Sequence, residues 1–240
     1  MILQVNSARK DFGGVTAVNN ASFDVKQQEI VGIIGPNGAG KTTLFNLISG
    51  ALPLSAGKIL FKGEDITSQK PDLICKKGVG RTFQEVKPFG NISVLENVQT
   101  GAYNRLSKRK EAREFAEHVL EKVKLIHRKD VTAKSLTIAD KKRLEVARAL
   151  ATKPELLLLD EVMAGLNPSE IQEIIPLIRS LAGEGITLIV IEHIMEVIIQ
   201  LSHRVIVVQH GEKIAEGTPT EVINDKRVIE AYLGEEITIA

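Results

Sequence analysis

Short apolar runs alternate with amphipathic stretches along this chain, and the alternation predicts its main elements. Residues 29–34 form an apolar run that ends at a glycine, and residues 42–49 follow with helical spacing, which predicts a strand, a loop and a helix. Two later apolar runs, each followed by a stretch with helical spacing, lie at 156–159 with 169–182 and at 186–191 with 193–200. Strands that alternate with helices are typical of a parallel sheet, so we expect an α/β fold.

Other patterns flank this core. Apolar segments punctuated by glycine predict an N-terminal layer of antiparallel strands, at residues 3–5, 16–18, 21–25 and 57–63. Apolar residues between 108 and 124 share one helical face, and we assign residues 88–153 to a helical subdomain. Residues 205–209 and 213–216 predict a C-terminal hairpin. We therefore expect one domain over residues 1–240, in which residues 1–87 and 154–240 form the core that carries the helical subdomain.

Composition limits the possible partners and compartment. The 31 Lys and Arg residues nearly balance 30 Asp and Glu, so the net charge of +1 favours no nucleic acid. The single cysteine, Cys75, cannot form an intramolecular disulfide, and the N-terminal residues do not have the pattern of a secretion signal, which favours the cytosol. The longest apolar runs are much shorter than the roughly 20 residues that a membrane-spanning helix needs.

The first chemical motif is the glycine-rich loop that joins the predicted strand at 29–34 to its helix. It matches the pattern G-x-x-x-x-G-K-[ST] and consists of Gly35, Pro36, Asn37, Gly38, Ala39, Gly40, Lys41, Thr42 and Thr43. Such a loop points backbone N–H groups at phosphate oxygens, where the helix dipole also favours an anion. Lys41 would bind the β- and γ-phosphates, and the Thr42 hydroxyl would ligate Mg²⁺. The motif predicts that the chain binds ATP or ADP.

The second motif is an acidic pair, Asp160 and Glu161, directly after the apolar run at 156–159. A run without polar residues predicts a strand that is buried on both faces of a sheet. Ligands of open α/β sheets bind at the carboxyl ends of the strands, where this pair would lie. We predict that Asp160 holds Mg²⁺ and that Glu161 polarises the attacking water.

The order of motifs resembles that of the ATPase subunits of ABC transporters over nearly the whole chain. The shared motifs are the P-loop, Gln84, Asp160 with Glu161, residues 164–167, and His193 after a predicted strand. The resemblance implies a P-loop NTPase fold with a mixed sheet, in which Gln84 contacts Mg²⁺ and the attacking water. It also implies that His193 contacts the γ-phosphate and that Phe12 stacks on adenine.

One motif departs from this family. The signature loop, Leu-Ser-Gly-Gly followed by Gln or Glu, aligns with Leu136, Thr137, Ile138, Ala139 and Asp140. The resemblance implies that Leu136, the Thr137 hydroxyl and the Ala139 N–H contact the ATP of an opposite subunit. Ile138 and Ala139 adopt a positive φ less readily than glycine, and Asp140 adds negative charge, so fast hydrolysis at the completed site is in question.

Milder departures are Val162, where the family usually has proline, and Asn167, where aspartate is common. Residues 81–84, 164–168 and 231–235 are most similar to the ATPase subunits of branched-chain amino acid importers. The resemblance implies a homo- or heterodimer of ATPase subunits that binds two ATP molecules at its interface. The dimer would work with two integral-membrane permeases and an extracytoplasmic binding protein, at the cytoplasmic face of the membrane.

Two alternatives stay open. One is the ATPase of a lipid or lipopolysaccharide exporter, and the other is a soluble ABC ATPase or ATP sensor with no role in transport. Soluble ABC ATPases usually have tandem halves, coiled-coil insertions or basic patches, and none of these features is evident in the sequence. The transported substrate cannot be read from the sequence, because in this architecture the substrate does not touch the ATPase.

Overall fold

The structure is a computed structural model that describes residues 1–83 and 87–233. The described chain divides into two compact units. The first contains residues 1–74 and the residues from 187 onwards, and the second contains residues 75–186. The predicted extents of the core and of the helical subdomain remain predictions.

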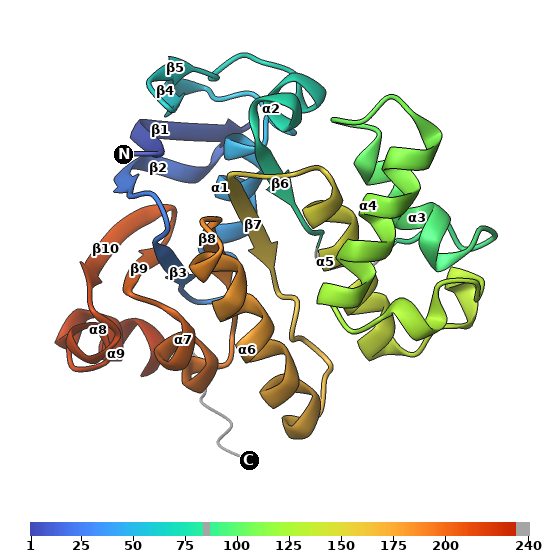
Figure 1. Ribbon diagram of the computed structural model, residues 1–240. Helices are drawn as coiled ribbons and strands as arrows, with labels where there is room; N and C mark the ends of the chain where they lie inside the picture. Colours follow the sequence, from blue (N-terminus) through green and yellow to red (C-terminus); the bar gives the residue numbers. More distant parts are fainter. Residues whose placement is uncertain (84–86, 234–240) are drawn as a thin grey trace. The chain divides into compact units, whose positions relative to one another are not determined.

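The first unit contains an antiparallel sheet near the N-terminus (Figure 1). Its strands lie in the order β2-β1-β4-β5, with bounds β1 (Leu3–Phe12), β2 (Val15–Val25), β4 (Ala56–Phe61) and β5 (Glu64–Asp65). This sheet confirms the expected N-terminal β layer. The segments predicted as separate strands at 16–18 and 21–25 are one strand. Asn20, between them, adopts a positive φ of 55°, and the pairing with β1 shifts register there, but the strand continues.

The same unit contains a second group of strands, in which β3 lies between two parallel neighbours. The order β10-β9-β3-β8 comprises β3 (Ile30–Ile34), β8 (Thr187–Ile191), β9 (Arg204–Gln209) and β10 (Glu212–Gly217). The antiparallel pair β9 and β10 is the predicted hairpin. Every residue of β3 and β8 is buried, as expected for strands covered on both faces.

Among the described residues, four helices belong wholly to this unit. They are α1 (Lys41–Ile48), α7 (Met195–Leu201), α8 (Pro219–Ile223) and α9 (Lys226–Leu233), and α2 (Pro71–Lys77) crosses the boundary between the units. Helix α7 begins later than predicted, because Ile194 is its N-cap residue and His193 precedes the cap. His193 therefore lies on the segment that leaves β8.

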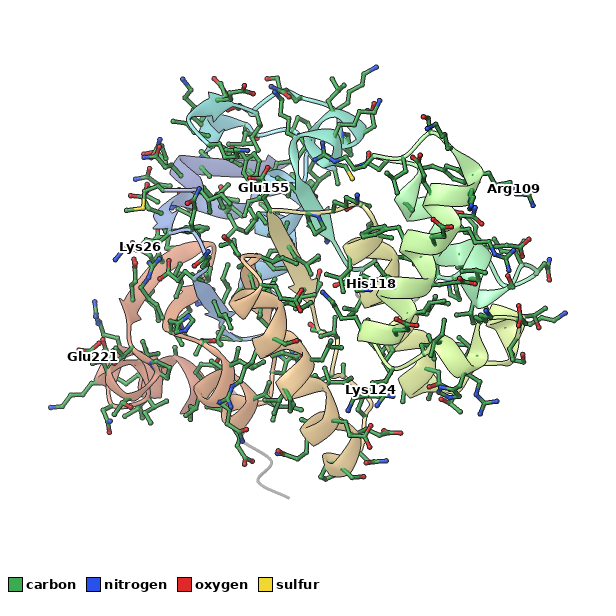
Figure 2. All side chains as sticks on the ribbon, viewed as in Figure 1. Lys26, Arg109, His118, Lys124, Glu155 and Glu221 are labelled. Carbon is green, nitrogen blue, oxygen red and sulfur yellow. The ribbon has the colours of Figure 1, made fainter. Side chains whose placement is uncertain are left out.

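The second unit combines two parallel strands with a group of helices (Figure 1). Its elements are β6 (Val79–Arg81), β7 (Leu156–Asp160), α3 (Val94–Ala102), α4 (Arg109–Lys122), α5 (Ile138–Ala151), α6 (Pro168–Gly183) and the 3₁₀ turns Ile126–Arg128 and Ala133–Ser135. Helix α4 has the predicted amphipathic face: Ala112 and Leu120 are buried, whereas Arg109 projects outwards (Figure 2). Helices α3, α4 and α5 pack on one another within the predicted helical range.

Within the residues that the structure describes, no helix has both the length and the apolar character needed to cross a membrane.

Candidate functional site

The glycine-rich loop follows the buried strand β3, and two of its glycines are required by close packing. A Cβ atom on Gly35 would lie 2.0 Å from the Val208 carbonyl oxygen, and one on Gly40 would lie 2.3 Å from the Ala17 carbonyl oxygen. Gly38 is different. Apart from Gly38 itself and its two chain neighbours, no described residue has a heavy atom within 4 Å of its Cβ position, although its φ of +77° favours glycine. The loop is therefore fixed by its neighbours at both ends and open to one side at Gly38.

The loop ends at the N-terminus of α1, which has features of an anion site. Gly40 is the N-cap and makes no side-chain cap hydrogen bond, and the first turn of the helix contains no acidic residue. Lys41 is only 6% exposed, and its Nζ donates to the carbonyl oxygens of Gly35 at 2.7 Å and Pro36 at 2.8 Å. An ammonium group thus lies against the loop beside the positive end of the helix dipole. This combination attracts a phosphate.

The other predicted loop residues surround this helix end. Asn37 is exposed, Ala39 is buried, and Thr42 and Thr43 are half-buried in the first turn of α1. The Ala39 carbonyl accepts from the Gly211 N–H at 3.0 Å, so the turn of the β9–β10 hairpin supports the loop. The hairpin turn and the loop therefore form one connected structure.

A polar network continues from the hairpin to strand β1. The Asn19 N–H donates to the Gly211 carbonyl at 2.8 Å, and the Asn19 Nδ2 donates to Glu212 Oε1 at 2.6 Å. Asn19 Oδ1 accepts from Arg9 Nη1 at 3.1 Å. Phe12 is the last residue of β1 and is 45% exposed, and the Lys10 ammonium lies 5.1 Å from the centroid of its ring. The face of an exposed ring is available for stacking.

His193 leaves the sheet at the same edge as the loop. Strands β3 and β8 are parallel with Ile33 opposite Ile191, and Gly35 and His193 each lie two residues further along. The His193 side chain is exposed. The first unit thus brings the loop and His193 to one sheet edge.

In the second unit, Asp160 ends β7 with its side chain fully buried. Its Oδ2 accepts from Arg81 Nη2 at 3.2 Å, and its backbone N–H donates to Thr82 Oγ1 at 3.0 Å. Among the described residues, Asp160 Oδ1 has no hydrogen-bond partner. Burial raises the pKa of Asp160, although the Arg81 guanidinium acts in the opposite direction. A buried carboxylate with a spare oxygen can ligate a cation.

Glu161 follows in a strained conformation. Its φ is +51°, in the left-handed region that non-glycine residues adopt at a cost of about 1–2 kcal/mol. The Glu161 carbonyl accepts from Lys142 Nζ at 2.8 Å, and both side chains are buried. Strain of this kind persists where surrounding contacts hold it, which is common at functional sites.

Helix α5 begins in the segment aligned with the signature loop. Thr137 is its N-cap, and the Thr137 Oγ1 accepts from the Asp140 N–H at 3.2 Å. Ile138 and Ala139 are already helical and have no positive φ, so glycine is not required here for backbone conformation. Leu136 is buried, Ala139 is half-buried, and Ile138 is 63% exposed. Gln84, the remaining predicted site residue, lies outside the described residues.

Comparison with known proteins decides the family. A family model described as ABC transporter matches residues 18–164. The high-affinity branched-chain amino acid transport ATP-binding protein LivG of Escherichia coli is 40% identical over 250 aligned residues, which cover 98% of each chain. The chain belongs to the ABC transporter family.

Other relatives agree with this assignment. BraF of Pseudomonas aeruginosa, a branched-chain amino acid transport protein of the same description, is 37% identical over 98% of each chain. A nucleotide-free ATP-binding cassette from an ABC transporter superposes with a TM-score of 0.89 at 33% identity, over 98% of this chain and 99% of the other. An ATP-binding cassette in its ADP conformation gives 0.88 at 33% identity, over the same shares. The predicted ABC ATPase fold is confirmed.

The departures from the family pattern at 162 and 167 are accommodated locally in this ABC cassette. Val162 is buried. Asn167 is the N-cap of α6, and its Oδ1 accepts from the Glu170 N–H at 3.0 Å and from Ser169 Oγ at 2.6 Å. Asparagine and aspartate are equally good N-caps, so this helix start does not depend on which is present.

The structure also reveals residues that the sequence analysis did not assign to the site. Arg81 and Thr82 bind Asp160, and Lys142 and Glu145 of α5 bind the backbone at Glu161 and Phe83. No local signal marks Glu145, because Lys141, Lys142, Arg143 and Arg148 are charged residues of the same helix. The second unit of the cassette therefore gathers Asp160, Glu161 and their supports from β6 and α5.

Proposed function

We propose that this chain is the ATP-hydrolysing subunit of an ABC importer for branched-chain or similar amino acids. Similarity to LivG and BraF supports the substrate class, because both are described as branched-chain amino acid transport proteins. A model described as branched-chain amino acid ATP-binding cassette transporter also matches residues 212–238. The C-terminal segment thus supports the same substrate class as the whole-chain comparison.

The start of α1 carries the ATP-binding part of the proposal. Its N–H groups face no side-chain cap, its first turn has no carboxylate, and the Lys41 ammonium is held against the loop. A triphosphate would replace the carbonyl oxygens as the partner of Lys41, while the open side at Gly38 leaves room for the approach. Exposed Phe12 is suited to stack on the adenine.

The resemblance implies a bound Mg²⁺, and each proposed ligand has by itself a group that can bind this ion. Asp160 has a buried carboxylate oxygen without a partner among the described residues, and Thr42 has a hydroxyl in the first turn of α1. No group of three His, Cys, Asp or Glu side chains in the described chain could hold a metal ion, so nucleotide phosphates would complete the coordination. Bound Mg²⁺ would neutralise charge on the phosphates. Asp160, Thr42 and, by resemblance, Gln84 are the proposed ligands.

Hydrolysis is proposed to proceed by in-line attack of water on the γ-phosphate. Glu161 orients the water and accepts its proton, and Lys41 stabilises the negative charge that develops on the phosphate oxygens. By resemblance, His193 and Gln84 contact the γ-phosphate and the attacking water. Lys142 binds the strained backbone of Glu161, and this contact restrains the position from which the Glu161 side chain extends.

The proposed assembly is the one that the family resemblance implies. Two ATPase subunits, identical or different, bind ATP between them and drive two integral-membrane permeases, with an extracytoplasmic binding protein supplying the substrate. The cassette would then lie at the cytoplasmic face of the membrane. Three large apolar side chains on the second unit are about half exposed and are suited to contact a membrane subunit: Phe83, Phe89 and Tyr103.

Reconstitution with candidate permeases tests the proposal. Vesicles that contain the complete complex should take up leucine, isoleucine or valine when supplied with ATP and the binding protein. Glu161→Gln should lower kcat for ATP hydrolysis by about 10²- to 10⁴-fold and leave ATP binding intact. Unchanged hydrolysis in this variant would refute the assignment of Glu161. Export of lipid without amino acid uptake would refute the import function.

A further inference from the structure

One face of α5 carries a stripe of three charged residues, two of which are buried. Lys142, Glu145 and Arg148 follow one another at intervals of three residues, which places them on the same side of the helix. Lys142 is 6% exposed and Glu145 is 5% exposed, and Leu144 and Val146 beside them are also buried. Buried charged groups are costly unless specific partners compensate them, so the partners of this stripe are informative.

Glu145 holds the chain where it leaves strand β6. Its Oε1 accepts from the Phe83 N–H at 2.6 Å, two residues after Arg81, the last residue of the strand. Its Oε2 has no partner among the described residues. Burial raises the pKa of Glu145 to about 7, while the Phe83 N–H, Lys142 and Arg148 act in the opposite direction. In the described residues, this buried carboxyl group thus makes one short hydrogen bond, to the Phe83 backbone.

That hydrogen bond continues a series of contacts around Asp160. The Thr82 N–H donates to the Leu158 carbonyl at 2.9 Å, and Thr82 Oγ1 accepts from the Asp160 N–H at 3.0 Å. Arg81 binds the Asp160 carboxylate. After Thr82 the segment that follows β6 no longer pairs with β7. The next backbone donor, the Phe83 N–H, binds the Glu145 carboxylate instead. Loss of this acceptor would free the residue directly after Thr82.

The other two members of the stripe bind neighbouring backbone. Lys142 donates to the Glu161 carbonyl at 2.8 Å. Arg148 Nη1 donates to the Lys87 carbonyl at 3.2 Å, and its guanidinium lies 4.8 Å from the centroid of the Phe89 ring. The stripe thus contacts the segments that follow both β6 and β7.

We propose that Glu145 is a positioning residue for ATP hydrolysis: by binding the Phe83 N–H it holds the end of β6, and through Thr82 and Arg81 it fixes the Asp160 carboxylate. This inference rests on the proposed ATPase function. Glu145 acts through the backbone and touches no reacting atom. A displacement of about 1 Å at a catalytic group can reduce a rate by about 100-fold, so a lost anchor should affect kcat more than ATP binding.

Two conservative substitutions distinguish the position of the Glu145 acceptor oxygen from the negative charge of its carboxylate. Glu145→Gln keeps a carbonyl oxygen at the same distance and removes the charge, whereas Glu145→Asp keeps the charge and withdraws the oxygen by one methylene. Since α5 fixes the Cα position, the Asp oxygen should lie beyond hydrogen-bond reach of the Phe83 N–H. A need for the hydrogen bond predicts a defect in the Asp variant, and a need for a buried charge predicts a defect in the Gln variant.

The assay measures kcat and KM for ATP in the complete transporter, with equilibrium binding of a fluorescent ATP analogue to each variant. Glu145→Asp should lower kcat by about 10- to 100-fold, with an affinity for the analogue within about 2-fold of wild type. Glu145→Gln should keep most of the wild-type kcat. The matched control is Glu117→Asp, which shortens a half-buried glutamate that binds Lys129 in the same unit. Thermal melting confirms that each variant is folded.

Three results would overturn the inference: wild-type kcat in Glu145→Asp, a larger defect in Glu145→Gln than in Glu145→Asp, or equal losses of affinity and kcat. An unfolded Asp variant beside a folded, fully active Gln variant would also overturn it, because Glu145 would then serve stability alone. If wild-type transporter hydrolyses no ATP, the proposed function fails before the variants are compared. The two failures are therefore distinguishable.

Discussion

Two helices of this ABC cassette begin at motifs associated with nucleotide, yet their N-termini are built differently. Helix α1 begins at Gly40, a residue without a side chain, and its first turn has no carboxylate. Helix α5 begins at Thr137, whose hydroxyl accepts from the Asp140 N–H, and it carries the Asp140 carboxylate in its first turn. The first helix start leaves donors for a ligand, and the second satisfies one donor itself.

The difference shows that a helix N-terminus is an anion site only when its own side chains leave it open. The helix dipole acts similarly at the N-termini of α1 and α5, where it stabilises a nearby negative charge by about 0.3–1 kcal/mol. At α1 an adjacent ammonium adds to this attraction, whereas at α5 a carboxylate opposes it. We therefore expect the isolated subunit to bind ATP through α1, with the α5 end contributing only when another subunit brings a nucleotide to it.

Removal of the Lys41 ammonium should produce the largest effect. Lys41→Ala deletes the cation at the α1 end, and we expect ATP affinity to fall by at least about 100-fold, which corresponds to a lost charge-assisted interaction. Isothermal titration of the purified subunit measures this change. Lys110→Ala, at an exposed position on α4, is the control and should bind ATP as wild type does. Retained affinity in Lys41→Ala would contradict the role of the α1 end.

Glu145, in the interior of α5, should have a smaller effect, which appears as a dependence of the free energy of unfolding on pH. The pKa of Glu145 is about 7 in the folded chain against an ordinary value of 4.5, so the folded state keeps a proton that the unfolded state has lost between these pH values. The contribution of Glu145 to the free energy of unfolding is complete below pH 4.5 and falls as pH rises to about 7.

Glu145→Gln has no such proton. Its free energy of unfolding relative to wild type should therefore increase by about 2 kcal/mol between pH 5 and pH 8, measured by urea denaturation at both pH values. Glu117→Gln, measured at the same two pH values, is the control for loss of a carboxylate elsewhere in the unit. A difference between Glu145→Gln and wild type that stays constant with pH would show that Glu145 is charged throughout this range.

The cap of α5 should give the smallest change. Thr137→Ala removes the acceptor for the Asp140 N–H, and we expect the free energy of unfolding to fall by about 1 kcal/mol. ATP affinity of the isolated subunit should stay within about 2-fold of wild type. Thr137→Ser keeps the cap and should restore stability. If Thr137→Ala weakened ATP binding as much as Lys41→Ala, the two helix ends would not differ as described.

Much of this architecture follows from local sequence. The strand, glycine loop and helix at α1 were predictable because glycines, Lys41 and the apolar run lie within a few residues of one another. The cap of α5 was also readable, since Thr137 precedes Asp140 by three residues, as in a capping motif. The glycines of the family's signature loop suggest a positive φ here, but no residue at this helix start has one.

The supports of Asp160 and Glu161 were not predictable from local sequence. Glu145 lies 62 residues from Phe83, and Arg81 lies 79 residues from Asp160. These contacts depend on how α5 packs beside β6 and β7, which periodicity does not determine. Several charged residues lie on α5, so the sequence does not show that Glu145 is the buried carboxylate, and its partner is known only from the tertiary structure.

A single substitution can place a carboxylate at the N-terminus of α1, as Asp140 does at the N-terminus of α5. Gly38 has open space at its Cβ position and a φ of +77°, which asparagine and aspartate tolerate better than other side chains. Titration of the isolated subunit with ATP should show Gly38→Asn within about 3-fold of wild type and the isosteric Gly38→Asp at least about 30-fold weaker. Equal affinity of the Asn and Asp variants would contradict the claim that this helix end binds the phosphates.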